Sequence, residues 1–211
     1  TWMQWRRARH GGVRPLLKDP IALFAAEWIA DAFDAQVILT VRHPAAFVHS
    51  LQRAGWFPNL EQWAQRDDLM NGPLASFAGS FRSAANEPTT GIERGAFLWA
   101  ALYDVVDTYR ARHPDWKVIR NEDLAMYPMD AYSDLFGYLN LPFGSDMRQH
   151  ICEYTKGPEH SAEKTPLHAV RRDSRKEAWK WRDALTSSEV SRIKEITHPV
   201  WTHFYNDPDE W

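Results

Sequence analysis

Residues 36–41 constrain the fold more than any other part of the chain. They read QVILTV, a nearly continuous run of apolar and β-branched residues. Such a run is typical of a strand that is buried on both faces, as in a parallel sheet. The run stops at Arg42-His43-Pro44, and residues 45–53 are predicted to form the next helix. A buried strand followed at once by a helix favours an α/β fold.

Two shorter apolar runs predict further strands. Leu16-Leu17 lies before Asp19-Pro20, which has the residue types of a helix N-cap and first helical position. Residues 21–33 are therefore predicted to be a helix. Val118-Ile119 is a third strand candidate. This order of strands and helices is typical of a parallel sheet with crossover connections.

The remaining segments are predicted to be mostly helical. We expect short helices over residues 55–86 and longer helices over 92–112, 128–139 and 146–154. A loop is predicted over 156–172. The last predicted helix begins with a capping box at Thr186 and Glu189 and runs to residue 197.

Composition limits the class of protein. The chain has 211 residues, of which 44% are hydrophobic and 25% charged, as in globular proteins, and it fits one domain over residues 1–211. The net charge of −3 argues against bulk binding to nucleic acid or a membrane, but leaves a local basic pocket open. No apolar run is long enough to span a bilayer. Cys152 is the only cysteine, which excludes an intrachain disulfide and favours a reducing compartment such as the cytoplasm.

Arg42 and Ser50 form the strongest candidate site. Arg42 follows the predicted strand, so its guanidinium is expected beside the N–H groups that begin the next helix, and both favour a phosphate. Ser50 falls on the second turn of that helix and offers a hydroxyl donor. The alternative is that Arg42 forms a surface ion pair and Ser50 is an ordinary solvated residue.

Two other basic groups are candidates for the same kind of ligand. Lys18 follows the first apolar run, and ligands of open α/β sheets collect at the carboxyl ends of strands. A lysine there can hold a transferring anionic group as a point charge. Arg171 and Arg172 begin a basic cluster that is able to fold over an anion. The alternatives are a solvated Lys18 beside a purely structural cap at Asp19, and a solvated charged surface.

These groups, in this order, resemble the sulfotransferases that use 3′-phosphoadenosine-5′-phosphosulfate (PAPS). The segment VILTVRHP with Ser50 is similar to the 3′-phosphate-binding segment of that family, which has an Arg and a Ser eight residues apart. VIRNEDL, at 118–124, is similar to the family's strand and following acidic segment. RRDS with Trp179-Lys180 resembles its carboxyl-terminal basic loop, and LKDP resembles the lysine segment of bacterial members.

The resemblance implies a helix-rich, three-layer α/β fold like that of the P-loop NTPases, with a short parallel sheet flanked by helices. It implies that Arg42 and Ser50 bind the 3′-phosphate and that Arg171 or Arg172 completes this pocket. It also implies that Lys18 stabilises charge near the transferred sulfuryl group. No metal is required in this family, and the histidines show no spacing typical of metal ligands.

The resemblance leaves the general base unassigned. Pro20 stands where animal cytosolic members have a catalytic histidine, and Asp19, His43 and His49 are candidates by their chemistry alone. The alternative is a base supplied by residues that precede Thr1. The family's phosphate-binding loop would precede Thr1, because nothing in the chain matches G-x-x-x-x-G-K-[ST]. We therefore expect a chain that begins at Thr1 to be amino-terminally incomplete, to lack its first strand, and to be inactive or incompletely assembled.

The implied reaction moves a sulfuryl group from PAPS to a hydroxyl or amine of a small-molecule or carbohydrate acceptor, leaving 3′-phosphoadenosine-5′-phosphate (PAP). An aromatic cleft for the acceptor is predicted from five residues, although packing explains them equally well: Trp56, Phe57, Trp63, Phe77 and Phe81. A homodimer is left open. Two other classes also remain: a P-loop kinase of a small nucleotide or sugar, and a non-catalytic module that binds a partner helix or a carbohydrate.

Overall fold

A computed structural model of the chain describes residues 14–19, 22–86, 89–155 and 173–211. The chain separates into two compact units, Thr1–Ala35 and Gln36–Trp211. The second unit contains both strands and most of the helices. One domain over residues 1–211 stays a prediction.

The described part of the first unit contains one helical segment. A 3-10 turn, η1 (Ala22–Ala25), leads directly into the helix α2 (Ala26–Phe33), so the helix predicted here is confirmed. The strand predicted at Leu16-Leu17 is wrong. Residues 14–19 are irregular, and Leu16 is 89% exposed. A strand needs a neighbour to satisfy its backbone groups, and no strand in the described ranges pairs with this run.

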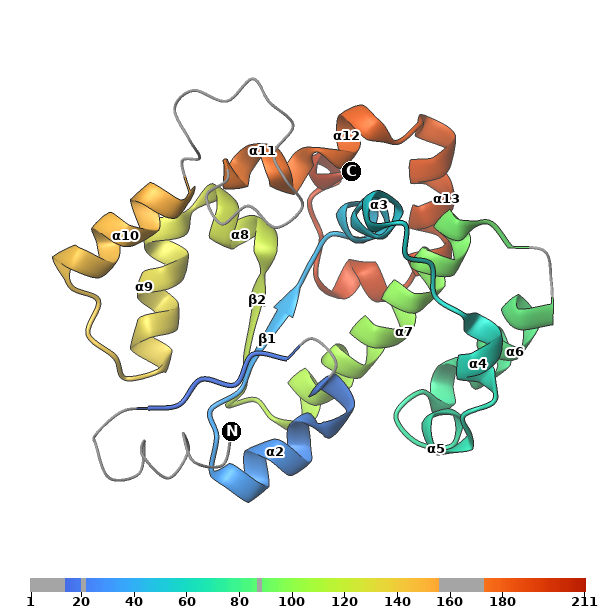
Figure 1. Cartoon of the computed structure of the whole chain (residues 1–211), viewed down its shortest axis with the longest axis horizontal. Helices are drawn as coiled ribbons and strands as arrows, with labels where there is room; N and C mark the ends of the chain where they lie inside the picture. The colour runs from blue at the N-terminus through green and yellow to red at the C-terminus, as the bar shows by residue number, and fades with distance from the viewer. Residues whose placement is uncertain (1–13, 20–21, 87–88, 156–172) are drawn as a thin grey trace. The chain divides into compact units, whose positions relative to one another are not determined.

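The second unit is built on a two-stranded parallel sheet. β1 (Ile38–Val41) pairs with β2 (Lys117–Arg120), and Val41 lies opposite Arg120. Figure 1 shows the two strands side by side. Because the strands run in the same direction, their carboxyl ends meet at one edge of the sheet.

β1 is shorter than predicted and is not buried on both faces. Leu39 and Val41 point to one face and are buried, whereas Ile38 and Thr40 on the other face are half-buried and exposed. The apolar run thus predicted the strand but overestimated how completely it is covered.

Two long helices of the crossover between the strands pack closely. α3 (Pro44–Ala54) begins one short turn after β1, and α7 (Gly91–Arg112) begins with a capping box of Thr90 and Glu93. A Cβ added at Gly95 would lie 3.4 Å from side-chain carbons of α3. The glycine therefore lets α7 approach α3 closely.

Shorter helices complete the second unit. Between α3 and α7 lie α4 (Leu60–Ala64), α5 (Asp67–Met70), η2 (Ala75–Phe77) and α6 (Ala78–Asn86). After β2 come α8 (Asn121–Met126), α9 (Pro128–Tyr138), α10 (Ser145–Thr155), α11 (Ser174–Trp179), α12 (Trp181–Ala184), α13 (Ser187–Thr197), η3 (Val200–His203) and η4 (Pro208–Glu210). In Figure 1, α8, α9 and α10 lie to one side of the strands, and α3, α7 and α13 lie to the other.

One apolar core joins α3 and α7 to the carboxyl-terminal helices. Its buried members are small on α3 and larger on α12 and α13: Ala45, Ala46, Val48, Ala96, Trp181, Leu185 and Ile193. The alanines leave room for the indole of Trp181, which is 2% exposed. This core fixes the first half of α3, and with it the turn that follows β1.

The structure confirms a helix-rich α/β arrangement with a short parallel sheet, and the predicted helices over 45–53, 92–112, 128–139 and 146–154 and up to 197. A three-layer fold like that of the P-loop NTPases stays a prediction. The loop predicted over 156–172 lies outside the described residues. Within the described ranges, no helix is both long enough and apolar enough to cross a membrane.

Candidate functional site

Side chains of α7 hold the turn between β1 and α3. The backbone N–H of Arg42 donates to the hydroxyl of Tyr103 at 3.2 Å. The backbone carbonyl of Arg42 accepts from the indole Nε1 of Trp99 at 2.7 Å. Trp99 and Tyr103 are four residues apart and share a face of α7. Because both backbone groups of Arg42 are engaged, the point from which its side chain extends is fixed.

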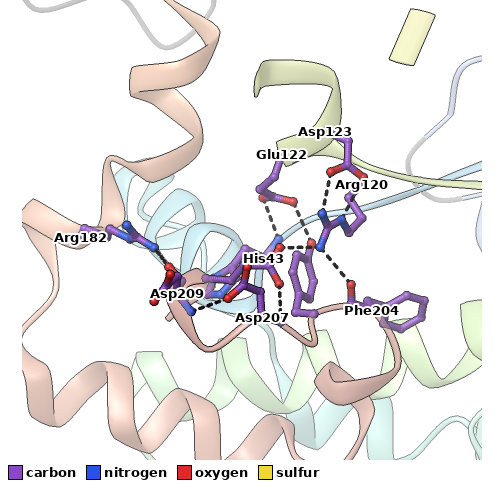
Figure 2. A network of polar contacts seen from close by, with 10 residues as sticks. His43, Arg120, Glu122, Asp123, Arg182, Phe204, Asp207 and Asp209 are labelled. Carbon is purple, nitrogen blue, oxygen red and sulfur yellow. Dashed lines mark hydrogen bonds and ion pairs between the residues drawn. The ribbon is translucent and has the colours of Figure 1, made fainter. Parts of the chain in front are cut away.

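A buried carboxylate holds the next residue of the turn. Glu122, in α8, accepts from the backbone N–H of His43 at 3.0 Å and from the hydroxyl of Tyr205 at 2.8 Å. Figure 2 shows Glu122 pointing toward His43. Glu122 is 2% exposed, and this burial raises its pKa, although the two hydrogen bonds and the charge of Arg42 act in the opposite direction.

His43 caps α3 and is fully buried. Its Nδ1 accepts from the backbone N–H of Ala45 at 3.3 Å, and its ring stacks on Trp181 with centroids 4.8 Å apart. Burial, assisted by neighbouring cations, lowers the pKa of His43 to about 3, so the ring is neutral near pH 7. A general base has to meet its acceptor, and a side chain without exposed surface does not. The structure therefore gives His43 a structural position.

The Arg42 guanidinium has no hydrogen-bond or ion-pair partner among the described residues. The side chain is half-buried, and burial lowers the pKa of Arg42, while the more distant charges of Glu122 and Glu177 raise it. Guanidinium carries five N–H donors and no acceptor. A partly desolvated cation with unused donors is suited to an anionic ligand.

Ser50 follows the N-cap residue His43 by seven positions, close to two helical turns. The two positions therefore share a face of α3, roughly 10 Å apart along the axis. Ser50 is half-buried. Burial lowers the pKa of the adjacent His49, and so do the charges of Arg53, Arg42 and Lys180.

A second group of charges links α3 to α11. Glu177 of α11 accepts from Arg53 of α3 at 3.3 Å and from Lys180 at 2.5 Å. Burial raises the pKa of Glu177, but the hydrogen bonds and charges of Lys180 and Arg53 outweigh it, so the net shift is downward. The α3–α11 patch is defined by Arg42, His49, Ser50, Arg53, Glu177 and Lys180.

The other predicted site residues lie in the first unit or outside the described residues. Lys18 and Asp19 belong to the first unit, where both are exposed and Lys18 does not follow a strand as predicted. Arg171 and Arg172 lie outside the described residues, directly before Asp173, which caps α11. Of the predicted anion-binding residues, Arg42 and Ser50 are the two that lie in the described part of the second unit, on one continuous strand–turn–helix segment.

The residues predicted to form an aromatic cleft are divided between core and surface. Phe81 is 1% exposed and stacks on Trp63, so packing accounts for this pair. Trp56 and Phe57 are about half exposed, at 49% and 48%. Phe57 also lines a hollow of about 500 Å³ together with residues of α3, α7 and α13. Phe77 is half-buried, so of the five residues Trp56 and Phe57 present the most surface to an acceptor.

Several groups at this site were not predicted from the sequence. Glu122 comes two residues after the end of β2. If the two predicted strands pair in parallel, their carboxyl ends lie at one edge of the sheet, and this would have placed Glu122 near Arg42. Trp99 and Tyr103 have no such signal, because aromatic residues on a long helix look like core residues. Glu177 resembles any charged residue of a solvated helix.

Comparisons of the chain with models of protein families, with characterised proteins and with solved structures found no match. Across the described ranges, no group of three or more His, Cys, Asp or Glu side chains is placed to hold a metal ion.

Proposed function

We propose that this chain contains the nucleotide-binding part of a PAPS-dependent sulfotransferase, in which the α3–α11 patch holds the 3′-phosphate. The observation that carries the proposal is the charged Arg42 guanidinium, which has no partner among the described residues. It stands where β1 passes into α3, at the carboxyl edge of a parallel sheet, where α/β proteins bind ligands.

The donors of the patch suit a phosphomonoester. Arg42 offers a planar fork that matches two phosphate oxygens, and the Ser50 hydroxyl offers a further donor. Arg53 and Lys180 add positive charge nearby. The start of α3 does not add to the patch, contrary to the sequence-based expectation. His43 caps it and residues 44–46 are buried, so its N–H donors are not open to a ligand. A dianionic group is favoured here over a neutral one.

The residues of the chain would act mainly by binding and orienting. Bound PAPS supplies a sulfuryl group on a phosphate leaving group, for transfer to a hydroxyl or amine of a small-molecule or carbohydrate acceptor. Arg42 and Ser50 would fix the 3′ end of the nucleotide, and the bonds of Trp99 and Tyr103 would keep Arg42 in place. Arg171 or Arg172 is proposed to complete this pocket, and Lys18 is proposed to stabilise charge near the transferred sulfuryl group.

Calorimetry with PAP and with adenosine 5′-phosphate, which lacks the 3′-phosphate, tests the proposal. We expect the chain to bind PAP more tightly, and Arg42→Ala to reduce PAP affinity by roughly 10- to 150-fold, as expected for losing about 1.5–3 kcal/mol of charge-assisted bonding. Arg82→Ala is the matched control, because Arg82 is exposed on α6. Equal binding of both nucleotides, or an Arg42→Ala variant that binds PAP like the unaltered chain, would refute the assignment.

A further inference from the structure

We infer that Glu177 limits the affinity of the α3–α11 patch for anions, because it is a resident counter-charge that an incoming phosphate must outweigh. The inference rests on the proposed function for the identity of the ligand. It assigns an affinity-limiting role to a residue outside the Arg42 and Ser50 pair.

The contacts of Glu177 place its carboxylate among the cations of the patch. One carboxylate oxygen lies 3.3 Å from Nη1 of Arg53, and the other lies 2.5 Å from Nζ of Lys180. The Glu177 side chain is only 21% exposed, so solvent screens it incompletely. Two of the four basic side chains in the patch are thus already engaged by one acidic group.

Glu177 also affects the other titratable groups of the patch. Burial lowers the pKa of His49 and of Arg42, and the charge of Glu177 acts against burial and raises both. Glu122 and Glu177 are the carboxylates whose charge reaches Arg42. Glu122 is engaged by the backbone of His43 and by Tyr205 inside the buried network. Among these groups, Glu177 is the carboxylate at the surface of the patch.

A phosphate bound by Arg42 and Ser50 would therefore lie within the field of a like charge. Removing that charge should strengthen binding, and it should release Arg53 and Lys180 to face the ligand. For partly exposed charges a few ångströms apart, a gain of roughly threefold to tenfold is expected at low salt. The gain should shrink as salt rises, because screening weakens the repulsion.

The test compares Glu177→Gln with the unaltered chain by calorimetry with PAP and by phosphorus NMR titration with inorganic phosphate. Glu195→Gln is the matched control, because Glu195 also pairs with a basic side chain three residues away, Arg192 at 2.8 Å, but on α13. We expect tighter binding of both ligands to Glu177→Gln alone. Unchanged or weaker binding would overturn the inference, and would show that the carboxylate serves only to fasten α11 to α3.

The two ligands separate this inference from the proposed function. If the unaltered chain binds no PAP but Glu177→Gln binds phosphate more tightly, the role inferred for Glu177 is supported and the proposed nucleotide ligand is refuted. If PAP binds equally to both chains, the proposed function stands and the inference falls. If neither chain binds either ligand, both are overturned.

Discussion

Two arginines stand at the same edge of the sheet, and only one of them is paired within the described residues. Arg120 ends β2 and donates to both carboxylate oxygens of Asp123, at 2.9 and 2.6 Å, and to Glu210 at 2.5 Å. Figure 2 shows its guanidinium directed at Asp123 and at the backbone of Phe204. Arg42 directly follows β1 and has no such partners.

This difference separates a structural arginine from an available one. Hydrogen bonding to Asp123, together with nearby carboxylates, raises the pKa of Arg120, whereas burial lowers the pKa of Arg42. Arg120 ties the carboxyl-terminal segment to the sheet through the Phe204 carbonyl and Glu210. The donors of Arg42 remain for a ligand, which is why the two strand ends should respond differently to substitution.

The largest expected effect is on the free energy of unfolding in acid, and it comes from His43 at the end of β1. Unfolded His43 takes up a proton below pH 6.5, whereas the folded ring takes one up only near pH 3, so lowering the pH favours the unfolded chain. The free energy of unfolding should fall by up to about 1.4 kcal/mol per pH unit in that interval. In His43→Asn, which keeps a capping side chain that does not titrate, this part of the slope should vanish. Urea unfolding between pH 7 and pH 3 measures it.

An unchanged slope in His43→Asn would mean that the end of β1 does not bury a neutral imidazole. Carboxylates elsewhere also contribute to acid unfolding, so the quantity to compare is the difference in slope between the two chains rather than either slope alone.

The next largest effect is the difference in stability at neutral pH between chains in which Arg120 or Arg42 is replaced. Arg120→Met leaves Asp123 and Glu210 without their cation and should cost about 2 kcal/mol, a value reduced because the Arg120 side chain is 29% exposed. Arg42→Met removes no hydrogen bond or ion pair of the described structure and should change the free energy of unfolding by less than about 0.5 kcal/mol. Chemical denaturation measures both, and equal losses would remove the distinction between the two arginines.

The sequence was informative where one local pattern decides the outcome. The apolar runs before Arg42 and Arg120, the capping box at Thr186 and the long helix after Thr90 all specify local structure, and all four elements formed. The Leu16-Leu17 run misled, because two residues determine no strand without a partner to pair with.

The pairing of each arginine was not predictable in the same way. Arg42 and Arg120 both follow short apolar runs and both look able to bind an anion. What separates them is tertiary structure: Glu210, far along the chain, folds back onto Arg120 and not onto Arg42. Contacts over such sequence distances have no local signature.

A smaller effect should follow from loosening the turn that carries Arg42. Tyr103→Phe removes the acceptor of the Arg42 N–H and should cost about 1 kcal/mol, with roughly fivefold weaker protection of that amide. Amide hydrogen exchange measures the protection residue by residue. Tyr132→Phe is the control, because Tyr132 makes no hydrogen bond within the described residues. Full protection of the Arg42 amide in Tyr103→Phe would show that the turn does not depend on α7.

The smallest effect is expected at Ser50. Ser50→Ala removes one neutral donor and should weaken PAP binding by about threefold to tenfold, with little change in stability because the hydroxyl is not bonded in the described structure. Calorimetry with Ser83→Ala, on the exposed side of α6, provides the reference. A larger loss for Ser50→Ala than for Arg42→Ala would reverse the roles given to the two residues.

A crystal structure of the chain with PAP tests the central claim most directly. We predict oxygens of the 3′-phosphate within about 3 Å of the Arg42 guanidinium and of the Ser50 hydroxyl, with the ion pairs of Arg120 unchanged. A 3′-phosphate bound elsewhere, with Arg42 turned into an ion pair with Glu122 or Glu177, would contradict it.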